Sequence, residues 1–164
     1  MRKSALRRRV IIARPPRGLL ALLTGDQVID LSLCHYSNLD AVATGVATEL
    51  TLWNLAEAAL TWSRVAEMLG AGEPEMRQSL ELVGALVSRY GATRRIEFVG
   101  EEYRRATDGA VHMDLLAAIV DAPTAIAAAV WSSRKVFELE AACARGAAVL
   151  AVVGADLAVP AATR

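Results

Sequence analysis

The chain of 164 residues is poor in aromatic side chains, cysteine and long apolar runs. Two cysteines, Cys34 and Cys143, are too few for the disulfide framework of a small secreted domain. The longest apolar stretch, 147–159, is interrupted by Asp156 and is shorter than the roughly 20 residues that a spanning helix needs. The basic start is followed by no small-x-small cleavage site. We therefore expect a cytoplasmic protein with no membrane segment.

What the chain has instead is alanine, which occupies 32 of its positions. Alanine is the strongest helix former and adds little buried area per residue, so it favours closely packed helices over a sheet sandwich. At this length one domain is expected, with enough chain to bury a core unaided by metal or disulfide. The composition predicts an all-α fold, a bundle of four to five helices.

The formal net charge of zero conceals two segments of opposite sign. Residues 1–25 hold seven basic side chains and no acid, whereas the rest of the chain holds 11 basic and 18 acidic ones. We define residues 1–17 as a basic, partly extended N-terminal arm and residues 18–164 as the single helical domain. Basic arms displace counterions from nucleic acid; a solvated terminus, or docking on the acidic body of a second subunit, are the alternatives. The candidate nucleic-acid contacts in the arm are Arg2, Lys3, Arg7, Arg8 and Arg9.

Apolar spacing and helix-ending residues place the elements. Residues 19–33 predict either a loose hairpin or a short helix followed by a loop. A long helix is predicted over 37–69, ending at Gly70, because glycine accepts the left-handed conformation there. It has two apolar stripes, one formed by Leu39, Val42, Val46, Leu50 and Trp53 and the other by Leu52, Leu55, Ala59, Trp62, Ala66 and Leu69. Further helices are predicted from Pro74 to a stop at Gly91, over 101–120 and over 124–145, and a short docking helix over 147–159.

The stretch Val65–Gln78 has the small residue, turn glycine and apolar residue of a helix-turn-helix at Ala66, Gly70 and Met76. Its second helix carries Arg77 and Gln78, side chains that contact base edges or phosphate in a major groove. The same helix is rich in glutamate, which phosphate repels. A DNA-binding regulator that uses this element and the arm is therefore an alternative function, and a plain helical corner is the simpler interpretation.

Arg105 and His112 have the loose Arg…His spacing of small helical ribonucleases of the HEPN class, in which His acts as acid or base and Arg stabilises phosphate. A polar residue normally follows that arginine, and here Ala106 does. This ribonuclease is the third candidate function.

The other chemistry-bearing residues form no recognised pattern. Cys34, His35, His112 and Cys143 lack metal-ligand spacing, and no phosphate loop or catalytic triad pattern occurs. We predict no catalytic residue, no metal site and no cofactor, and hence a protein that is not an enzyme.

Trp53 and Trp62 lie nine residues apart, so they point to opposite sides of one helix. Either a central helix buries both, or one of them lines a subunit interface, where tryptophan is enriched. Because the helix over 37–69 has two apolar faces, an oligomer with Trp53 or Trp62 at its interface is favoured.

The segment Gly45-Val-Ala-Thr-Glu-Leu-Thr-Leu-Trp53, preceded by Arg7-Arg8-Arg9-Val10, resembles small, mostly uncharacterised α-helical proteins carried on proteobacterial plasmids, integrated elements and phages. The resemblance covers about residues 7–120 and implies an accessory protein of a mobile element, with no catalytic residue. We predict a non-enzymatic helical protein that acts by macromolecular association, as a homo-oligomer or with another protein.

Overall fold

The computed structural model describes residues 22–145, and this part of the chain confirms the all-α class. It contains five helices: α1 (Gly25–Ala43), α2 (Glu49–Leu69), α3 (Glu73–Thr93), α4 (Glu102–Ala117) and α5 (Ala122–Ala144). The predicted arm and the predicted helix over 147–159 lie outside the described residues.

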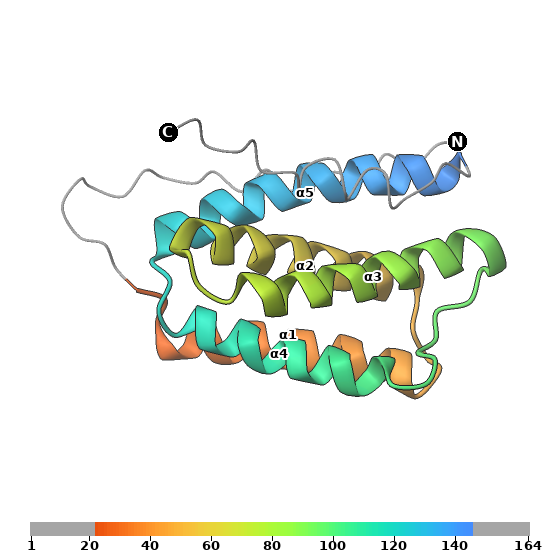
Figure 1. The fold of residues 1–164 in the computed structure, drawn as a ribbon, viewed down its shortest axis with the longest axis horizontal. Helices are drawn as coiled ribbons and strands as arrows, with labels where there is room; N and C mark the ends of the chain where they lie inside the picture. Colours follow the sequence, from red (N-terminus) through yellow and green to blue (C-terminus); the bar gives the residue numbers. More distant parts are fainter. Residues whose placement is uncertain (1–21, 146–164) are drawn as a thin grey trace, which may run out of the picture.

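Consecutive helices run in opposite directions and form three layers (Figure 1). Helices α1 and α4 form one outer layer, α2 and α3 the middle layer, and α5 the other outer layer. Helix α1 packs on α2, α2 on α3, α3 on α4 and α4 back on α1, while α5 packs mainly on α2. The fold is an up-and-down four-helix bundle with a fifth helix added on the α2 side.

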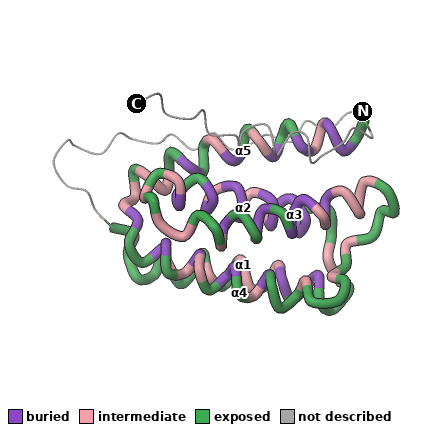
Figure 2. Tube along the Cα trace, in the orientation of Figure 1, coloured by how far each residue is buried: buried purple, intermediate pink, exposed green. Residues whose placement is uncertain are grey.

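Helix α2 is the centre of the core because it contacts both outer layers. Buried positions line it on several sides, as Figure 2 shows for the middle layer. Leu52, Leu55 and Val65 are essentially inaccessible to solvent. Contacts with α1 and α3 on one side and α5 on the other therefore explain why α2 has apolar residues on more than one side.

The predicted continuous helix over 37–69 is wrong: α1 ends at Ala43 and α2 begins at Glu49. Gly45 has φ +74°, a left-handed conformation that ends the first helix. Thr48 then caps α2, exchanging side-chain to backbone hydrogen bonds with Thr51. The interruption leaves Val46 and Leu50 exposed, although they belong to the predicted stripe.

The hairpin alternative over 19–33 is also wrong within the described residues. Thr24 caps α1 through a capping box with Gln27, so the chain from Gly25 onward is helical. Leu22 pairs instead with Asp121 in an isolated antiparallel bridge. Capping by Thr24 outweighs the weak alternation of apolar residues that favoured strands.

The other predicted ends are close to those observed. Gly70 ends α2 in the left-handed conformation, as predicted. Gly91 does not end α3, which continues to Thr93 and stops where Arg94 takes φ +59°. Asp121 caps α5 by accepting a hydrogen bond from the Thr124 N–H. Within residues 22–145, no helix combines the length and the apolar character needed to cross a membrane.

Candidate functional site

The contact between α1 and α4 is organised around the carboxylate of Asp114. Ser32 Oγ donates a hydrogen bond to Asp114 Oδ1 at 2.5 Å, and the Tyr36 hydroxyl donates to Oδ2 at 3.3 Å. Nearer the other end of the contact, the Tyr103 hydroxyl donates to Asp40 Oδ1 at 3.2 Å. These bonds fix the register of the two antiparallel helices.

Large aliphatic side chains flank this polar contact and remain exposed to solvent. Ile29 and Leu33 lie three residues before and one residue after Ser32, while Val111 and Leu115 flank Asp114 in the same way. Because the register joins Ser32 to Asp114, both pairs border one surface. We call this surface the α1–α4 patch; its members are Ile29, Leu33, Val111, Leu115 and Ile119.

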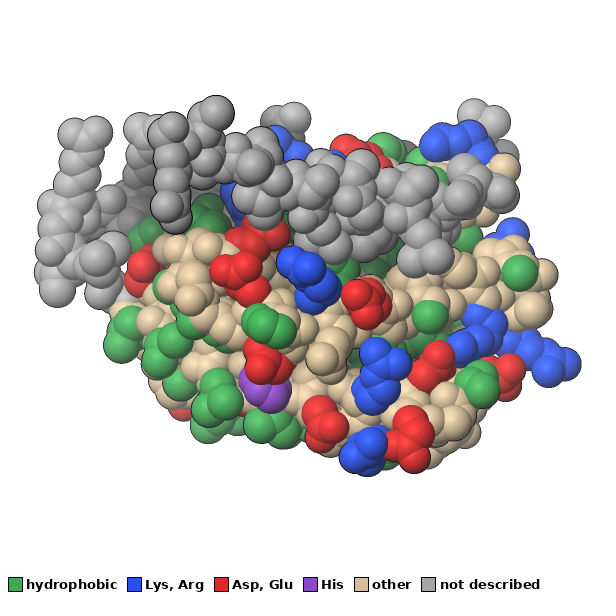
Figure 3. Space-filling view, in the orientation of Figure 1, with side chains coloured by type: hydrophobic (Ala, Val, Ile, Leu, Met, Phe, Trp, Pro, Cys, Tyr) green, Lys and Arg blue, Asp and Glu red, His purple; other side chains and the backbone are tan. Residues whose placement is uncertain are grey.

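Exposure is high throughout the patch, reaching 61% for Leu115 and 64% for Leu33. Figure 3 shows hydrophobic side chains gathered at the lower left of the molecule, over the end of the α1–α4 layer. Contiguous exposed apolar surface on a soluble domain usually marks an interaction site. The patch is therefore a candidate contact surface for another macromolecule.

His35 lies beside this contact and is largely buried. Its Nδ1 atom is buried and has no hydrogen-bond partner in the described structure. Burial lowers the pKa of His35 from 6.5 to about 4. The negative charge of Asp114 acts in the other direction and raises this pKa, but its effect is smaller. The imidazole is therefore neutral at physiological pH.

Trp53 and Trp62 are only 8% and 7% exposed in the single chain. The Trp53 indole donates a hydrogen bond to Glu49 on its own helix. Helix α2 has neighbours on both sides, so both indoles are buried within one protomer, which is the alternative of a central helix that buries both. A subunit interface at Trp53 or Trp62 stays a prediction.

The stretch Val65–Gln78 forms the end of α2, a short turn and the start of α3. Ala66 and Met76 are buried between the two helices, whereas Arg77 and Gln78 are exposed. The helices lie side by side in opposite directions (Figure 1), unlike the crossing of about 90–120° in a helix-turn-helix. Glu73 and Glu81 line the same hollow as Arg77 and Gln78.

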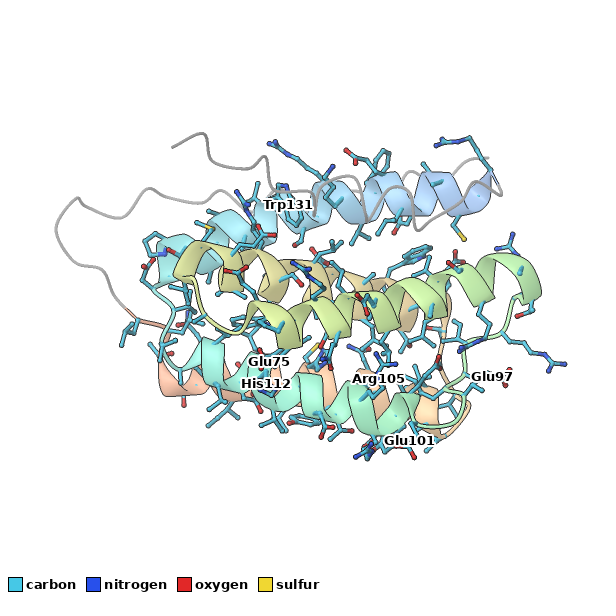
Figure 4. All side chains as sticks on the ribbon, in the orientation of Figure 1. Glu75, Glu97, Glu101, Arg105, His112 and Trp131 are labelled. Atoms are coloured by element: carbon cyan, nitrogen blue, oxygen red, sulfur yellow. The ribbon has the colours of Figure 1, made fainter. Side chains whose placement is uncertain are left out.

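Arg105 and His112 both lie on α4, where Figure 4 labels them. Arg105 is exposed, and His112 is half-buried with its Nδ1 atom 3.0 Å from the Asp108 carbonyl oxygen. Seven residues correspond to about two turns, or roughly 10 Å along the helix axis. A ribonuclease that uses both residues stays a prediction.

The remaining candidates are separated or not described. Arg2, Lys3, Arg7, Arg8 and Arg9 lie outside the described residues, so nucleic-acid binding by the arm stays a prediction. The potential metal ligands on α1, α4 and α5 do not gather: within residues 22–145 no three His, Cys, Asp or Glu side chains form a metal-binding group.

Sequence reasoning missed the α1–α4 patch. The signal was present, since Val111, Leu115 and Ile119 recur every four residues and Ile29 and Leu33 have the same spacing. From the sequence alone, Val111, Leu115 and Ile119 are available to the core, and Ile29 and Leu33 fall in the segment predicted as a hairpin or a short helix and loop. Apolar spacing does not distinguish a buried stripe from an exposed one.

The nine-residue core of the mobile-element resemblance, Gly45–Trp53, forms the α1–α2 turn and the first turn of α2. It is a structural segment, and none of its residues belongs to the α1–α4 patch. No protein-family model, curated protein or solved structure matches the chain significantly.

Proposed function

We propose that this protein acts by macromolecular association, and that its partner at the α1–α4 patch is a second copy of the same chain. The observation that carries the proposal is the cluster of five exposed aliphatic side chains on two adjacent helices. Burial of such surface is favourable by about 25 cal/mol per Å². Association at the patch would therefore bury apolar surface that the single chain leaves exposed to solvent.

A second copy suits this surface because the patch is aliphatic throughout. Most homo-oligomers use a two-fold contact in which the same surface of both subunits meets, and an apolar surface is complementary to itself. The α1–α4 layer of one protomer would then pack on the α1–α4 layer of its partner. Such a dimer is a structural or accessory component and needs no catalytic residue.

The DNA-binding alternative gains less support from the described residues. Arg77 and Gln78 are exposed, but the carboxylates of Glu73 and Glu81 beside them repel phosphate. The antiparallel packing of α2 and α3 also differs from a helix-turn-helix. Self-association is therefore the first proposal, and duplex DNA binding is a possible outcome that would displace it.

Sedimentation analysis over a dilution series tests the proposal. We expect wild-type protein to have a mass above the 17.5 kDa of one chain at micromolar concentration, and Leu115→Glu to sediment as a monomer with unchanged helical circular dichroism. Val46→Glu is the matched control, since Val46 is as exposed but lies in the α1–α2 turn. A wild-type monomer at every concentration would overturn the proposal.

A gel-shift titration on duplex DNA at two salt concentrations separates the alternative. We expect no salt-sensitive shift for the full chain. A shift that weakens with salt and is lost in Arg7→Gln/Arg8→Gln/Arg9→Gln would instead place the basic arm on nucleic acid and move DNA binding to first place.

A further inference from the structure

A cavity of about 410 Å³ lies between α1, α2 and α5, away from the α1–α4 patch. Its volume is within the range of pockets that hold drug-sized molecules. The cavity exists because the residues that face each other there are small. Ala58 on α2 and Ala125 and Ala129 on α5 line it, where larger side chains would fill the space.

Hydroxyl and carboxylate groups hold α5 beside this cavity. Thr61 and Ser132 share a hydrogen bond of 2.5 Å between their Oγ atoms, and Ser133 donates to the Glu57 carboxylate. These contacts fix the distance between α2 and α5. Because this distance is fixed, α2 and α5 do not move together to fill the space beside the small alanine side chains, and the cavity stays open.

Most of the cavity wall is apolar, and Leu23, Leu31, Ile126 and Trp62 are among the residues that line it. The polar lining groups come from two helices: α1 contributes His35 and Asn38, and α2 contributes Asn54, Glu57 and Thr61. A cavity with apolar walls and a few convergent polar groups is the usual form of a small-molecule site.

Among the described residues that line the cavity, Glu57 is the only acid, and none is Lys or Arg. His35 also lines it, and this side chain is neutral at physiological pH because burial lowers its pKa to about 4. The lining therefore has a formal charge of −1. An aromatic wall such as Trp62 adds attraction for a cation.

From this lining we infer that the cavity binds an apolar organic monocation of drug-like size, with the positive centre near Glu57 and the apolar groups against the walls. A neutral apolar molecule would leave Glu57 without a counter-charge, and an organic anion would be repelled by it. The inference is independent of self-association, since the residues of the α1–α4 patch do not line this cavity.

Two ions of the same shape and opposite charge test the inference: tetraphenylphosphonium and tetraphenylborate, each titrated into the full chain by isothermal calorimetry. We expect tetraphenylphosphonium to bind at least tenfold more tightly than tetraphenylborate. Glu57→Gln should weaken binding of the cation about tenfold and remove the preference for positive charge. Glu138→Gln, an acid-to-amide change on α5 outside the cavity lining, should leave both affinities unchanged.

Ala129→Leu provides a second variant, because Ala129 lines the cavity at an exposed helix position where leucine is tolerated. A leucine there fills the space, and binding of the cation should be lost. Equal affinity of wild-type protein for the two ions would overturn the inference. So would unchanged cation binding in folded Glu57→Gln or Ala129→Leu protein, with folding checked by circular dichroism.

Discussion

Gly109 on α4 lies directly against Ser79 on α3. A Cβ atom added at Gly109 would lie 2.2 Å from Ser79 Oγ and 3.3 Å from Ser79 Cβ. Ser79 Oγ in turn donates a hydrogen bond to the Glu75 carbonyl oxygen at 3.3 Å. Glycine inside α4 costs about 1 kcal/mol of helix stability relative to alanine, and this close approach explains why glycine is needed there.

Gly109→Ala should therefore destabilise the protein despite the better helix propensity of alanine. Overpacking typically costs about 1–3 kcal/mol and the better propensity of alanine offsets about 1 kcal/mol of this, so we expect a net loss of up to about 2 kcal/mol in urea unfolding. The double mutant tests the cause: in a Ser79→Ala background, the overlap with Oγ is gone and Gly109→Ala should be neutral or stabilising. Equal effects of Gly109→Ala in both backgrounds would contradict the assigned contact.

His35 should make stability depend on pH between about 6.5 and 4. Its pKa falls to about 4 in the folded protein because of burial, whereas the unfolded chain titrates near 6.5. The unfolded state therefore binds the proton first as the pH falls, and folded-state stability that is complete above pH 6.5 is lost progressively, by up to about 3 kcal/mol.

Urea midpoints measured from pH 7 to pH 4.5 check this dependence. His35→Leu should flatten the decline, because leucine takes up no proton. His112→Leu, which removes the other histidine, is measured in parallel as the control. If both variants lose stability as steeply as wild type, His35 is not the residue responsible.

The ion pair between Arg89 and Glu102 should stabilise the connection between α3 and α4. The two guanidinium nitrogens donate to the two carboxylate oxygens at 2.7 and 3.0 Å, and the Val99 N–H donates to the same carboxylate at 2.8 Å. Arg89 also donates to the Glu97 carbonyl oxygen. Because both side chains are mostly buried, we expect Glu102→Gln to cost about 1–2 kcal/mol at pH 7.

Glu101→Gln is the matched control, since the Arg104–Glu101 pair is largely exposed and contributes less than about 0.5 kcal/mol. The contribution of the Arg89–Glu102 pair to stability should also depend on pH. Burial alone would raise the pKa of Glu102, but hydrogen bonds from Arg89 and Val99 and the charges of Arg89 and Arg105 lower it below 4.5. This stabilisation is present above pH 4.5 and is lost as the pH falls further, so wild type and Glu102→Gln should converge in stability there.

Gly45→Ala should destabilise the protein by about 1 kcal/mol, because alanine is strained at φ +74°. Within residues 22–145 no heavy atom lies within 4 Å of the added Cβ, so the expected loss comes from backbone conformation. Gly25→Ala, which also meets open space but has ordinary helical backbone, should be neutral or slightly stabilising. Thermal unfolding of both variants distinguishes conformational strain from a general effect of removing glycine.

Local signals explain which parts of the fold were predictable. The alanine content and the spacing of Met76, Leu80, Val83 and Val87 predicted α3, because periodicity reports a helix with one buried side. The break between α1 and α2 was missed because apolar residues continue with helical spacing through Val46 and Leu50. The Gly45 conformation and the Thr48 cap decide the boundary, and both are weak signals within an apolar pattern.

The candidate sites were less predictable than the helices. The α1–α4 patch depends on Ser32 reaching Asp114, 82 positions along the chain, and the cavity depends on alanines of α2 and α5 facing each other. Spacing along one helix identifies an apolar side, but it does not determine which neighbour covers that side. The same limit applied to Trp53 and Trp62 on α2, which lie buried because other helices pack on both sides of α2.

By itself, the sequence determined that this protein is helical, because alanine content, helical periodicity and capping residues act within a few positions of one another. Only the tertiary structure decided which apolar side chains are core and which are exposed. That distinction depends on how the helices pack: α5 covers one side of α2, whereas no described helix covers Leu115 and Ile119 on α4. Burial is a property of contacts between distant segments, and for this reason the patch and the cavity appear only in the folded chain.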